Sequence, residues 1–392
     1  MDAPVFAAAC STLSDTSAAV EEAGQRTSAQ LGGAADLAFV FFSGDHIAAG
    51  HAIGSRLCAT LQTDNLIGCS GESIVATGAE HEGTPAVSVW AARLPGARVL
   101  PMHLDFSPSP EGGSLTGWPD DLPAVWPAPS ALFALGDPFS FPVESLLKLV
   151  NEEHPGIPVL GGMASTASQP GENLLIYGRR AVSQGCVGAL VSGGPPIRCL
   201  VSQGCRPIGQ PFVITKAERN VIQQLGGLPA YQRLVEVYQS LATSEQAQVR
   251  RGLHVGRVVS EYQERFEQGD FLVRNVMGVD QQEGIIAIGD YVRAGQTVQF
   301  HVRDADTADA ELRQLLSQAR KTSSSGGGAL LFTCNGRGTR LFPSPHHDAG
   351  AIAGQLGNIP VAGFFAAGEL GPIGGRNFIH GFTACVALFA PA

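Results

Sequence analysis

The chain of 392 residues carries little charge. Only 15% of its residues are Asp, Glu, Lys or Arg, and 35 acidic residues outnumber 25 basic ones. No basic run interrupts this balance, which argues against the electrostatic footprint of a nucleic-acid-binding protein. Apolar runs are also short, since none reaches the roughly 18 residues that a membrane-spanning helix requires. We therefore expect neither nucleic acid nor a membrane as a partner.

Signals for secretion are missing as well. The first residues, MDAPVFAAACSTLSD, contain no basic segment ahead of an apolar one, unlike a signal peptide. The eight cysteines form no CxxC motif, and most of them lie in apolar, strand-like runs. Reduced thiols in a cytoplasmic protein are the expected state. Cys199 and Cys205 are close enough to bridge a hairpin, but we predict no disulfide.

Motifs for phosphate, dinucleotide and metal binding are absent or weak. There is no G-x-x-x-x-G-K-[ST], and no G-x-G-x-x-G opens a helix after a strand. His346, His347, Asp348 and His51 could suggest a metal ion. Adjacent histidines, however, point to opposite sides of a strand or about 100° apart on a helix, which suits joint ligation poorly. We expect HHD to begin a helix instead, with Asp348 near its N-terminus, and we predict no cofactor and no metal.

Glycine, by contrast, is abundant, and the 49 glycines are spread through apolar segments. One arrangement occurs three times, at 37–96, 131–194 and 328–390. It consists of a strand that ends in a small or polar turn, a helix, a second strand that ends in small residues, and a third apolar strand. Repeats place equivalent turns at the same edge of their sheets, and small residues there admit a ligand. The site is therefore expected at these turns: 43–46, 69–72, 164–166, 334–337 and 367–369.

Other segments complete a mixed fold of the α/β or α+β kind, with internally repeated β-α-β-β units. An amphipathic helix over 11–31 begins near Asp15 or Thr16, and Trp118 and Trp126 are expected to pin a Pro- and Gly-rich loop. The remaining predicted elements are a hairpin or two strands at 199–218, a helix from about Pro229, strands at 271–280, 284–290 and 297–304, and a helix at 306–321. We place a domain boundary near residue 200.

The segment GCSGES (68–73) resembles a nucleophile elbow loosely, but it does not match G-x-S-x-G. Cys69 or Ser70 could act as a nucleophile with His46 or His81 as its base. The residues favour the simpler interpretation, in which Ser70 and Gly71 form a tight strand end.

The segment CNGRGTR (334–340) places the Cys334 thiol, an amide and a guanidinium directly after an apolar strand. The fork of Arg337 suits a carboxylate or phosphate, and Asn335 can both donate and accept hydrogen bonds. A β-turn with a solvent-facing arginine explains the same residues equally well.

A second segment, GELGPIGGRNFIHGFT (368–383), adds an acid to this picture. Glu369 would bind the ammonium group of an amino acid while Arg337 binds its carboxylate. An internal ion pair of Glu369 with Arg337 or Arg376 is the competing interpretation. The complete set of predicted ligand-binding residues is Ser43, His46, Cys69, Ser70, Glu72, Cys334, Asn335, Arg337, Glu369, Asn377 and His380.

Taken together, four segments resemble the FIST family, whose name stands for F-box and intracellular signal transduction. In chain order they are GCSGESIVATG, FLVRNVMGVDQQEGIIAIGDYVRAGQTVQFHVRDA, CNGRG, and GFFAAGELGPIGG followed by NFIHGFT. The resemblance spans about 30–390 and implies an N-terminal FIST domain within 1–200 and a C-terminal one within 201–392. Only about 30 residues precede it, too few for an F-box, so we expect a stand-alone form.

The resemblance also implies a function. It implies a sensory module for small ligands, so we expect a small polar metabolite, such as an amino acid, in a cleft between the two halves. We also expect an unknown downstream signalling protein as partner. We expect a binding protein rather than an enzyme. Two alternatives stay open: a hydrolase or transferase that uses Cys69, Ser70 or Cys334, and a protein-interaction scaffold without a metabolite.

Overall fold

A computed structural model describes residues 3–110, 113–262, 266, 268–321 and 327–390. The chain folds into two compact units, which are described separately. Unit 1 comprises Met1–Ser202 and Leu312–Ala392, and unit 2 comprises Gln203–Glu311. The chain returns to unit 1 at Leu312, so the third strand–helix–strand copy folds with the first two. Mixed helices and strands confirm the predicted fold class.

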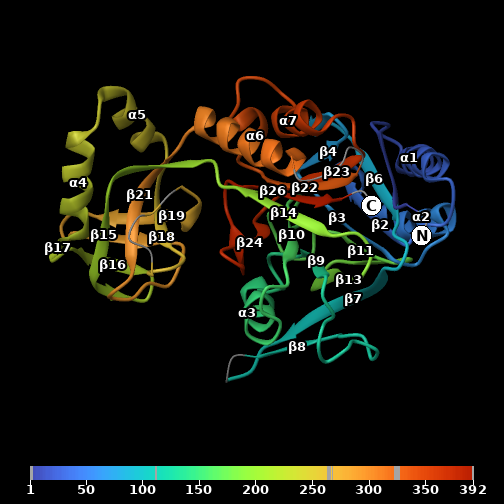
Figure 1. The fold of residues 1–392 in the computed structure, drawn as a ribbon, viewed down its shortest axis with the longest axis horizontal. Helices are drawn as coiled ribbons and strands as arrows, with labels where there is room; N and C mark the ends of the chain where they lie inside the picture. The colour runs from blue at the N-terminus through green and yellow to red at the C-terminus, as the bar shows by residue number, and fades with distance from the viewer. Residues whose placement is uncertain (1–2, 111–112, 263–265, 267, 322–326, 391–392) are drawn as a thin grey trace. The chain divides into compact units, whose positions relative to one another are not determined.

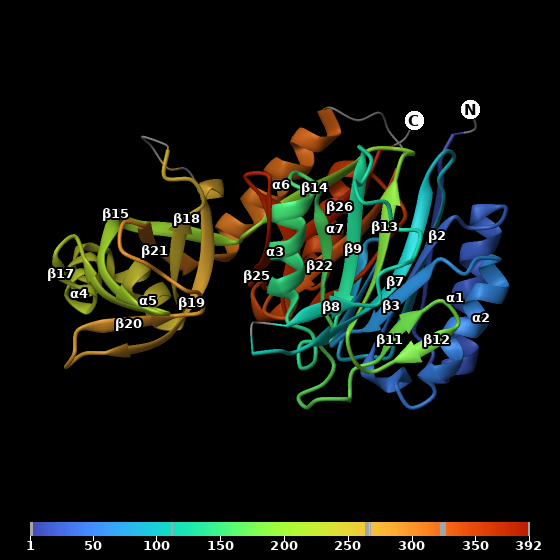
Figure 2. The same ribbon diagram turned by 90° about the horizontal axis from the view of Figure 1, so that it is seen from below.

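Unit 1 contains three sheets (Figures 1 and 2). The strand order of the first is β1 (Val5–Ser11), β6 (Val87–Arg93), β2 (Leu37–Phe42), β3 (Leu66–Ser70), β11 (Leu175–Tyr177) and β12 (Arg180–Val182). That of the second is β25 (Arg376–His380), β24 (Glu369–Ile373), β10 (Val159–Met163), β9 (Ser130–Gly136), β13 (Cys186–Ser192), β7 (Arg98–Ser107) and β8 (Ser114–Thr116). That of the third is β14 (Ile197–Ser202), β26 (Ala384–Phe389), β22 (Gly328–Cys334), β23 (Val361–Ala366), β4 (Ser73–Ala76) and β5 (Ala79–Glu82).

All three sheets share one pairing pattern. The central strand, β2, β9 or β22, runs parallel to the next strand of its own copy and antiparallel to the last strand of that copy. In each copy, a hairpin lies in the chain between the second and the last strand, and it pairs with a strand of a different sheet. Hairpin β4–β5 extends the third sheet, β11–β12 the first, and β24–β25 the second. The three sheets are thus linked in a cycle. The expected β-α-β-β units did not include the hairpins that make these links.

One glycine in each copy marks the close approach of the two parallel strands. A Cβ atom there would lie only about 2 Å from a carbonyl oxygen of the neighbouring strand, which no side chain can tolerate. The paired residues are Val40 and Gly68 at 2.1 Å, Ala134 and Gly161 at 1.9 Å, and Leu331 and Gly363 at 1.8 Å. Part of the glycine content therefore serves strand contacts rather than turns.

The inner faces of the three sheets meet in one aromatic core. The rings of Phe39 and Phe133, from the first and second sheets, lie 5.1 Å apart between centroids. Phe389 of the third sheet lies 4.9 Å from Trp90 of the first. Truncating one such ring to alanine typically costs about 3–5 kcal/mol, so this core, together with the exchanged hairpins, holds the sheets together.

Helices cover the outer faces (Figures 1 and 2). The first sheet is covered by α1 (Thr16–Leu31) and α2 (Ile53–Leu61), the second by α3 (Val143–Glu153), and the third by α6 (Ala305–Lys321) and α7 (His347–Leu356). Short 3₁₀ turns are η1 (Gly44–His46), η2 (Gly50–Ala52) and η4 (Gly338–Arg340). No described helix is both long and apolar enough to cross a bilayer.

The predicted N-terminal helix is present as Thr16–Leu31 and begins at one of the two predicted caps. Its cap is Asp15, whose Oδ1 accepts a hydrogen bond from the Ala18 amide at 2.8 Å. The preceding Val5–Ser11 forms strand β1 against β6 instead of remaining outside the sheet. Local periodicity could not reveal this strand, because its partner lies some eighty residues away in the chain.

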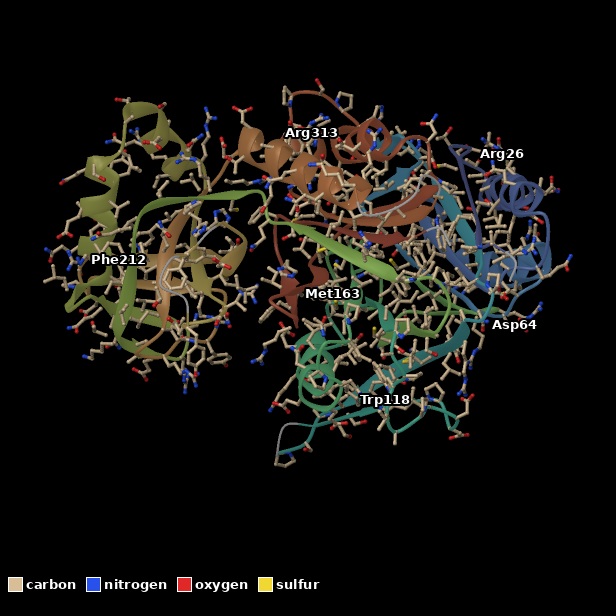
Figure 3. All side chains as sticks on the ribbon, in the orientation of Figure 1. Arg26, Asp64, Trp118, Met163, Phe212 and Arg313 are labelled. Atoms are coloured by element: carbon tan, nitrogen blue, oxygen red, sulfur yellow. The ribbon has the colours of Figure 1, made fainter. Side chains whose placement is uncertain are left out.

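Unit 2 is a small closed sheet. Its strand order is β15 (Cys205–Glu218), β21 (Thr297–Arg303), β18 (Leu253–Val258), β19 (Phe271–Asp280), β20 (Ile285–Ile288), β16 (Val221–Leu225) and β17 (Leu228–Pro229), and pairing of β15 with β16 closes the ring. Its helices are α4 (Ala230–Ser240), α5 (Thr243–Arg251) and η3 (Gln268–Asp270). Phe212, labelled in Figure 3, contacts Phe300 in its core.

The three antiparallel strands predicted within unit 2 are present as β19, β20 and β21. Of the two alternatives predicted at 199–218, a hairpin or two strands, the structure has two strands that do not pair with each other. Strand β14 pairs with β26 in unit 1, whereas β15 pairs with β21 and β16 in unit 2. The chain passes from one unit to the other between these two strands, so they do not pair with each other.

Candidate functional site

The turn that follows β22 holds a buried ion pair. Arg337 is fully buried and makes two hydrogen bonds to Asp348, from Nε to Oδ2 at 2.7 Å and from Nη2 to Oδ1 at 2.8 Å. Thr333 donates a third bond to the same carboxylate at 2.7 Å. Burial alone would raise the pKa of Asp348, but the charge and hydrogen bonds of Arg337 outweigh it and hold that pKa below its usual range.

This pairing changes the interpretation of the CNGRG segment. The solvent-facing arginine that the turn residues suggested is wrong, because Arg337 is 0% exposed. Its fork is occupied by Asp348, which lies in the first turn of α7 and favours that helix N-terminus. As expected, HHD begins a helix.

Glu369 begins strand β24 and is also fully buried. Its Oε2 accepts a hydrogen bond from the Thr383 amide at 3.1 Å, whereas Oε1 has no hydrogen-bond partner in the described part of the chain. Burial raises the pKa of Glu369 to about 8 against the smaller lowering effects of Thr383, Cys334 and Arg337. The carboxyl is therefore largely neutral at pH 7, which suits an ammonium ligand less than a carboxylate would.

Hairpin β4–β5 delivers another buried acid to this region. Glu80 accepts a hydrogen bond from the Ala349 amide of α7 at 2.9 Å, and its own amide donates to Nδ1 of His346 at 2.9 Å. Burial, followed by the charge of Asp348, raises the pKa of Glu80 to about 7. No local pattern in the sequence marks Glu80, because only the pairing of hairpin β4–β5 with the third sheet brings β5 to α7.

Asn377 and His380 have internal partners. The Asn377 amide accepts from the Val159 amide at 2.8 Å and donates to the Ile157 carbonyl at 2.8 Å and to Oδ1 of Asn151 at 3.1 Å. His380 Nε2 lies 2.9 Å from the Gly371 carbonyl oxygen within the same hairpin. Asn377 thus fastens hairpin β24–β25 to α3 and β10.

The predicted residues of the first copy are also engaged in the fold. Ser43 accepts from the Ala86 amide at 3.0 Å and donates to Asp45 at 2.9 Å. Nδ1 of His46 lies 3.0 Å from the Thr16 hydroxyl, and burial lowers the pKa of this histidine.

The two candidate nucleophiles at the end of β3 are closed to solvent. Cys69 belongs to the central core, and burial raises its pKa well above the ordinary value of a thiol. Ser70 ends β3 and accepts a hydrogen bond from the Leu174 amide at 3.1 Å. This arrangement corresponds to the tight strand end that the residues favoured.

The turns themselves do meet, as the repeat suggested. Ser165, after β10, accepts a hydrogen bond from the Glu72 amide at 2.9 Å and donates to the carbonyl of Phe365 on β23. A Cβ atom on Gly44, after β2, would lie 2.7 Å from Cγ2 of Thr166. Turns from all three copies are therefore in contact within unit 1, which also contains every predicted site residue.

An ion pair lies at the exposed rim of these turns. Arg340 binds both carboxylate oxygens of Glu72, and its Nη1 also donates to the Asn335 carbonyl at 2.9 Å. The two side chains retain 57% and 38% of their exposure. Arg340 was not identified from the sequence, although it closes the CNGRGTR segment three residues after Arg337 and lies within the same turn.

Polar atoms without partners lie beside this pair. Oδ1 of Asn335 and the hydroxyl of Thr166 are buried and make no hydrogen bond within the described ranges. The half-buried Cys334 accepts a hydrogen bond from the Gly336 amide at 3.4 Å. We name the group formed by Glu72, Thr166, Cys334, Asn335 and Arg340 the convergent turn site. Across residues that the structure describes, no three His, Cys, Asp or Glu side chains are grouped to hold a metal ion.

Comparison with known proteins identifies the family. The model of the FIST N domain matches residues 36–228, and that of the FIST C domain matches residues 228–372. The chain belongs to the FIST family. The boundary at 228 falls inside unit 2, at strand β17, so the two family domains do not coincide with the two compact units.

Relatives of this FIST protein match nearly its whole length. A protein of Mycobacterium tuberculosis (strain ATCC 25618 / H37Rv), described as uncharacterized, is 42% identical over 381 residues, covering 97% of this chain and 98% of its own. An uncharacterized protein of Mycobacterium bovis is 41% identical over 383 residues, covering 97% of both chains. FIST domains are associated with signal transduction and with the sensing of small ligands.

Proposed function

We propose that this FIST protein is a sensor that binds a small polar metabolite, with an amino acid as the first candidate, at the convergent turn site. One observation carries the proposal. Turns from three copies that are far apart in the sequence meet there, and they bring together an exposed ion pair and buried polar atoms without partners. A purely structural turn cluster has no need of that combination.

The ion pair matches the two ends of a zwitterion. The guanidinium of Arg340 would bind the ligand carboxylate through its fork, and the carboxylate of Glu72 would bind the ammonium group. Exposed ion pairs contribute only about 0–1 kcal/mol, so separating this pair to admit a ligand costs little. The sequence predicted that an acid and an arginine bind the two ends of the ligand. This proposal assigns those roles to Glu72 and Arg340 in place of Glu369 and Arg337, because Arg337 is occupied by Asp348.

The unpartnered atoms supply the link to signalling. An unmade hydrogen bond in a buried place costs about 1–3 kcal/mol, so a ligand that satisfies Asn335 or Thr166 gains free energy. Both atoms are closed to solvent in this conformation. A ligand would therefore engage them by selecting a conformation in which the turn at 335–340 has moved, and that population shift is the signal a sensor can transmit.

A thermal-shift screen with amino acids tests the proposal. A ligand at a hundred times its Kd stabilises the folded state by about 2.7 kcal/mol, so a hit raises the melting temperature. Arg340→Gln and Glu72→Gln should each abolish that rise. The matched control is Arg179→Gln, which removes an exposed pair with Asp64 (N–O distance 2.8 Å) at the opposite end of strand β3 from the turn at 71–72 and should leave the rise intact. An equal rise in all four proteins would exclude the convergent turn site.

The enzyme alternative now depends on Cys334, the half-buried thiol among the candidate nucleophiles. Rapid modification of Cys334 by a thiol reagent near pH 7, with slow modification elsewhere, would favour catalysis over sensing. A cytoplasmic location and a downstream signalling partner remain part of this proposal. Failure of every metabolite in the screen would favour an interaction scaffold.

A further inference from the structure

A second cleft lies beside the second sheet of unit 1. It has a volume of about 230 Å³ and is formed by the segment after β8 together with the C-terminal end of α3. Trp118, labelled in Figure 3, lies on that segment. None of the lining residues belongs to the convergent turn site. Those used below are Trp118, Leu122, Trp126, Leu149, Glu153 and His154.

Aromatic rings form one wall of this cleft. Trp126 is only 5% exposed and stacks on the imidazole of His154, with ring centroids 4.1 Å apart and planes 11° from parallel. Trp118 packs against Trp126 with a centroid distance of 6.5 Å, but it stays half-buried and keeps open surface at the cleft. The inner tryptophan therefore holds the wall in place, and the outer one offers its ring to a ligand.

The charge around the cleft is negative. Helix α3 carries three glutamates and one lysine, and none of its last-turn residues is basic. Glu153 is exposed at the cleft, and in the parts of the chain that the structure describes it has no ion-pair partner. Burial lowers the pKa of the neighbouring His154, against a raising effect of Glu153, and so favours the neutral imidazole.

We propose that this cleft binds an alkylated ammonium ion, held over the ring of Trp118 with Glu153 as its counter-charge. Cations are attracted to the face of an indole ring, and alkyl groups lower the cost of removing the cation from water. The side chains of Leu122 and Leu149 provide apolar surface for those alkyl groups. A metal ion or a fully hydrated ammonium would gain much less from these walls. This inference is independent of the proposed sensor function.

Titration with tetramethylammonium chloride, at ionic strength kept constant with sodium chloride, tests the proposal. Tryptophan fluorescence reports on the cleft, because Trp90 lies in the central core and the other two tryptophans form the cleft wall. We expect a saturable change in the wild-type protein. The uncharged analogue 2,2-dimethylpropan-1-ol, which has a quaternary carbon in place of the nitrogen and one added hydroxyl group, should bind at least about fivefold more weakly, since it lacks the cation–π and Coulomb attraction.

Variants separate the cleft from general salt effects. Glu153→Gln should weaken tetramethylammonium binding about fivefold or more, whereas Glu152→Gln, an exposed neighbour that does not line the cleft, should leave it within about twofold. Trp118→Leu should abolish binding as measured by thermal shift. If that variant does not fold, the exposed Glu153 and Glu152 variants decide alone. Equal binding of the neutral analogue, equal losses in both glutamate variants, or no saturable change would each overturn the proposal. Arg340→Gln should leave this binding unchanged.

Discussion

The ion pair between Arg337 and Asp348 is expected to be a major local contribution to the stability of unit 1. Arg337→Ala would leave the fully buried Asp348 without its two charged hydrogen bonds, at 2.7 and 2.8 Å. Breaking a buried pair in this way typically costs about 3–5 kcal/mol. Arg337→Lys keeps the charge but loses the fork, so it should cost about 1.5–3 kcal/mol, the value of one charged hydrogen bond.

Urea unfolding followed by tryptophan fluorescence measures this effect in the right unit, because all three tryptophans lie in unit 1. Arg340→Ala is the matched control. It removes an arginine from the same turn, but its pair with Glu72 is exposed, so the expected loss is about 0–1 kcal/mol. The urea midpoint should decrease in the order wild type, Arg340→Ala, Arg337→Lys, Arg337→Ala. The dependence of the unfolding free energy on urea concentration should be the same in all four proteins. A loss below about 1 kcal/mol for Arg337→Ala would refute the reasoning and make Arg337 available to a ligand again.

Three further predictions concern pH, packing and thiols. Because the pKa of Glu369 is raised from 4.5 to about 8, its contribution to stability is complete below about pH 4.5 and is lost as the pH rises towards 8. In Glu369→Gln the urea midpoint should therefore fall less between these pH values. An identical change of the urea midpoint with pH in both proteins would contradict the burial argument. Gly363→Ala should destabilise unit 1 by at least about 1–3 kcal/mol, because the new Cβ would meet a carbonyl oxygen. Gly350→Ala in α7 should stabilise it by up to about 1 kcal/mol, because the new Cβ would meet no atom within 4 Å outside its own helix backbone. Equal urea midpoints for the two variants would count against the strand contact. All eight cysteines are free, so the mass after alkylation of the unfolded protein should be the same with and without prior reduction, and in the native protein Cys334 should be alkylated before Cys69.

The sequence by itself determined the local architecture. The strand–helix–strand order of each copy, the helix at 306–321 and the helix that begins at HHD were all legible, because periodicity and capping residues act over a few positions. The order of motifs also identified the FIST family, which the family models confirm. The repeated order led us to expect a site at the turns, but the contacts between turns of different sheets form only through tertiary packing.

The tertiary structure alone decided which groups these turns leave available. Arg337 follows its strand as predicted, but its partner became clear only when α7 placed Asp348 against it. Glu80 reaches α7 because hairpin β4–β5 joins the third sheet rather than its own. Glu369 is largely neutral because the packed sheets remove water from it. Strand pairing and burial depend on residues far apart in the chain, so residue order indicates which side chains follow a strand but not which of them remain free for a ligand.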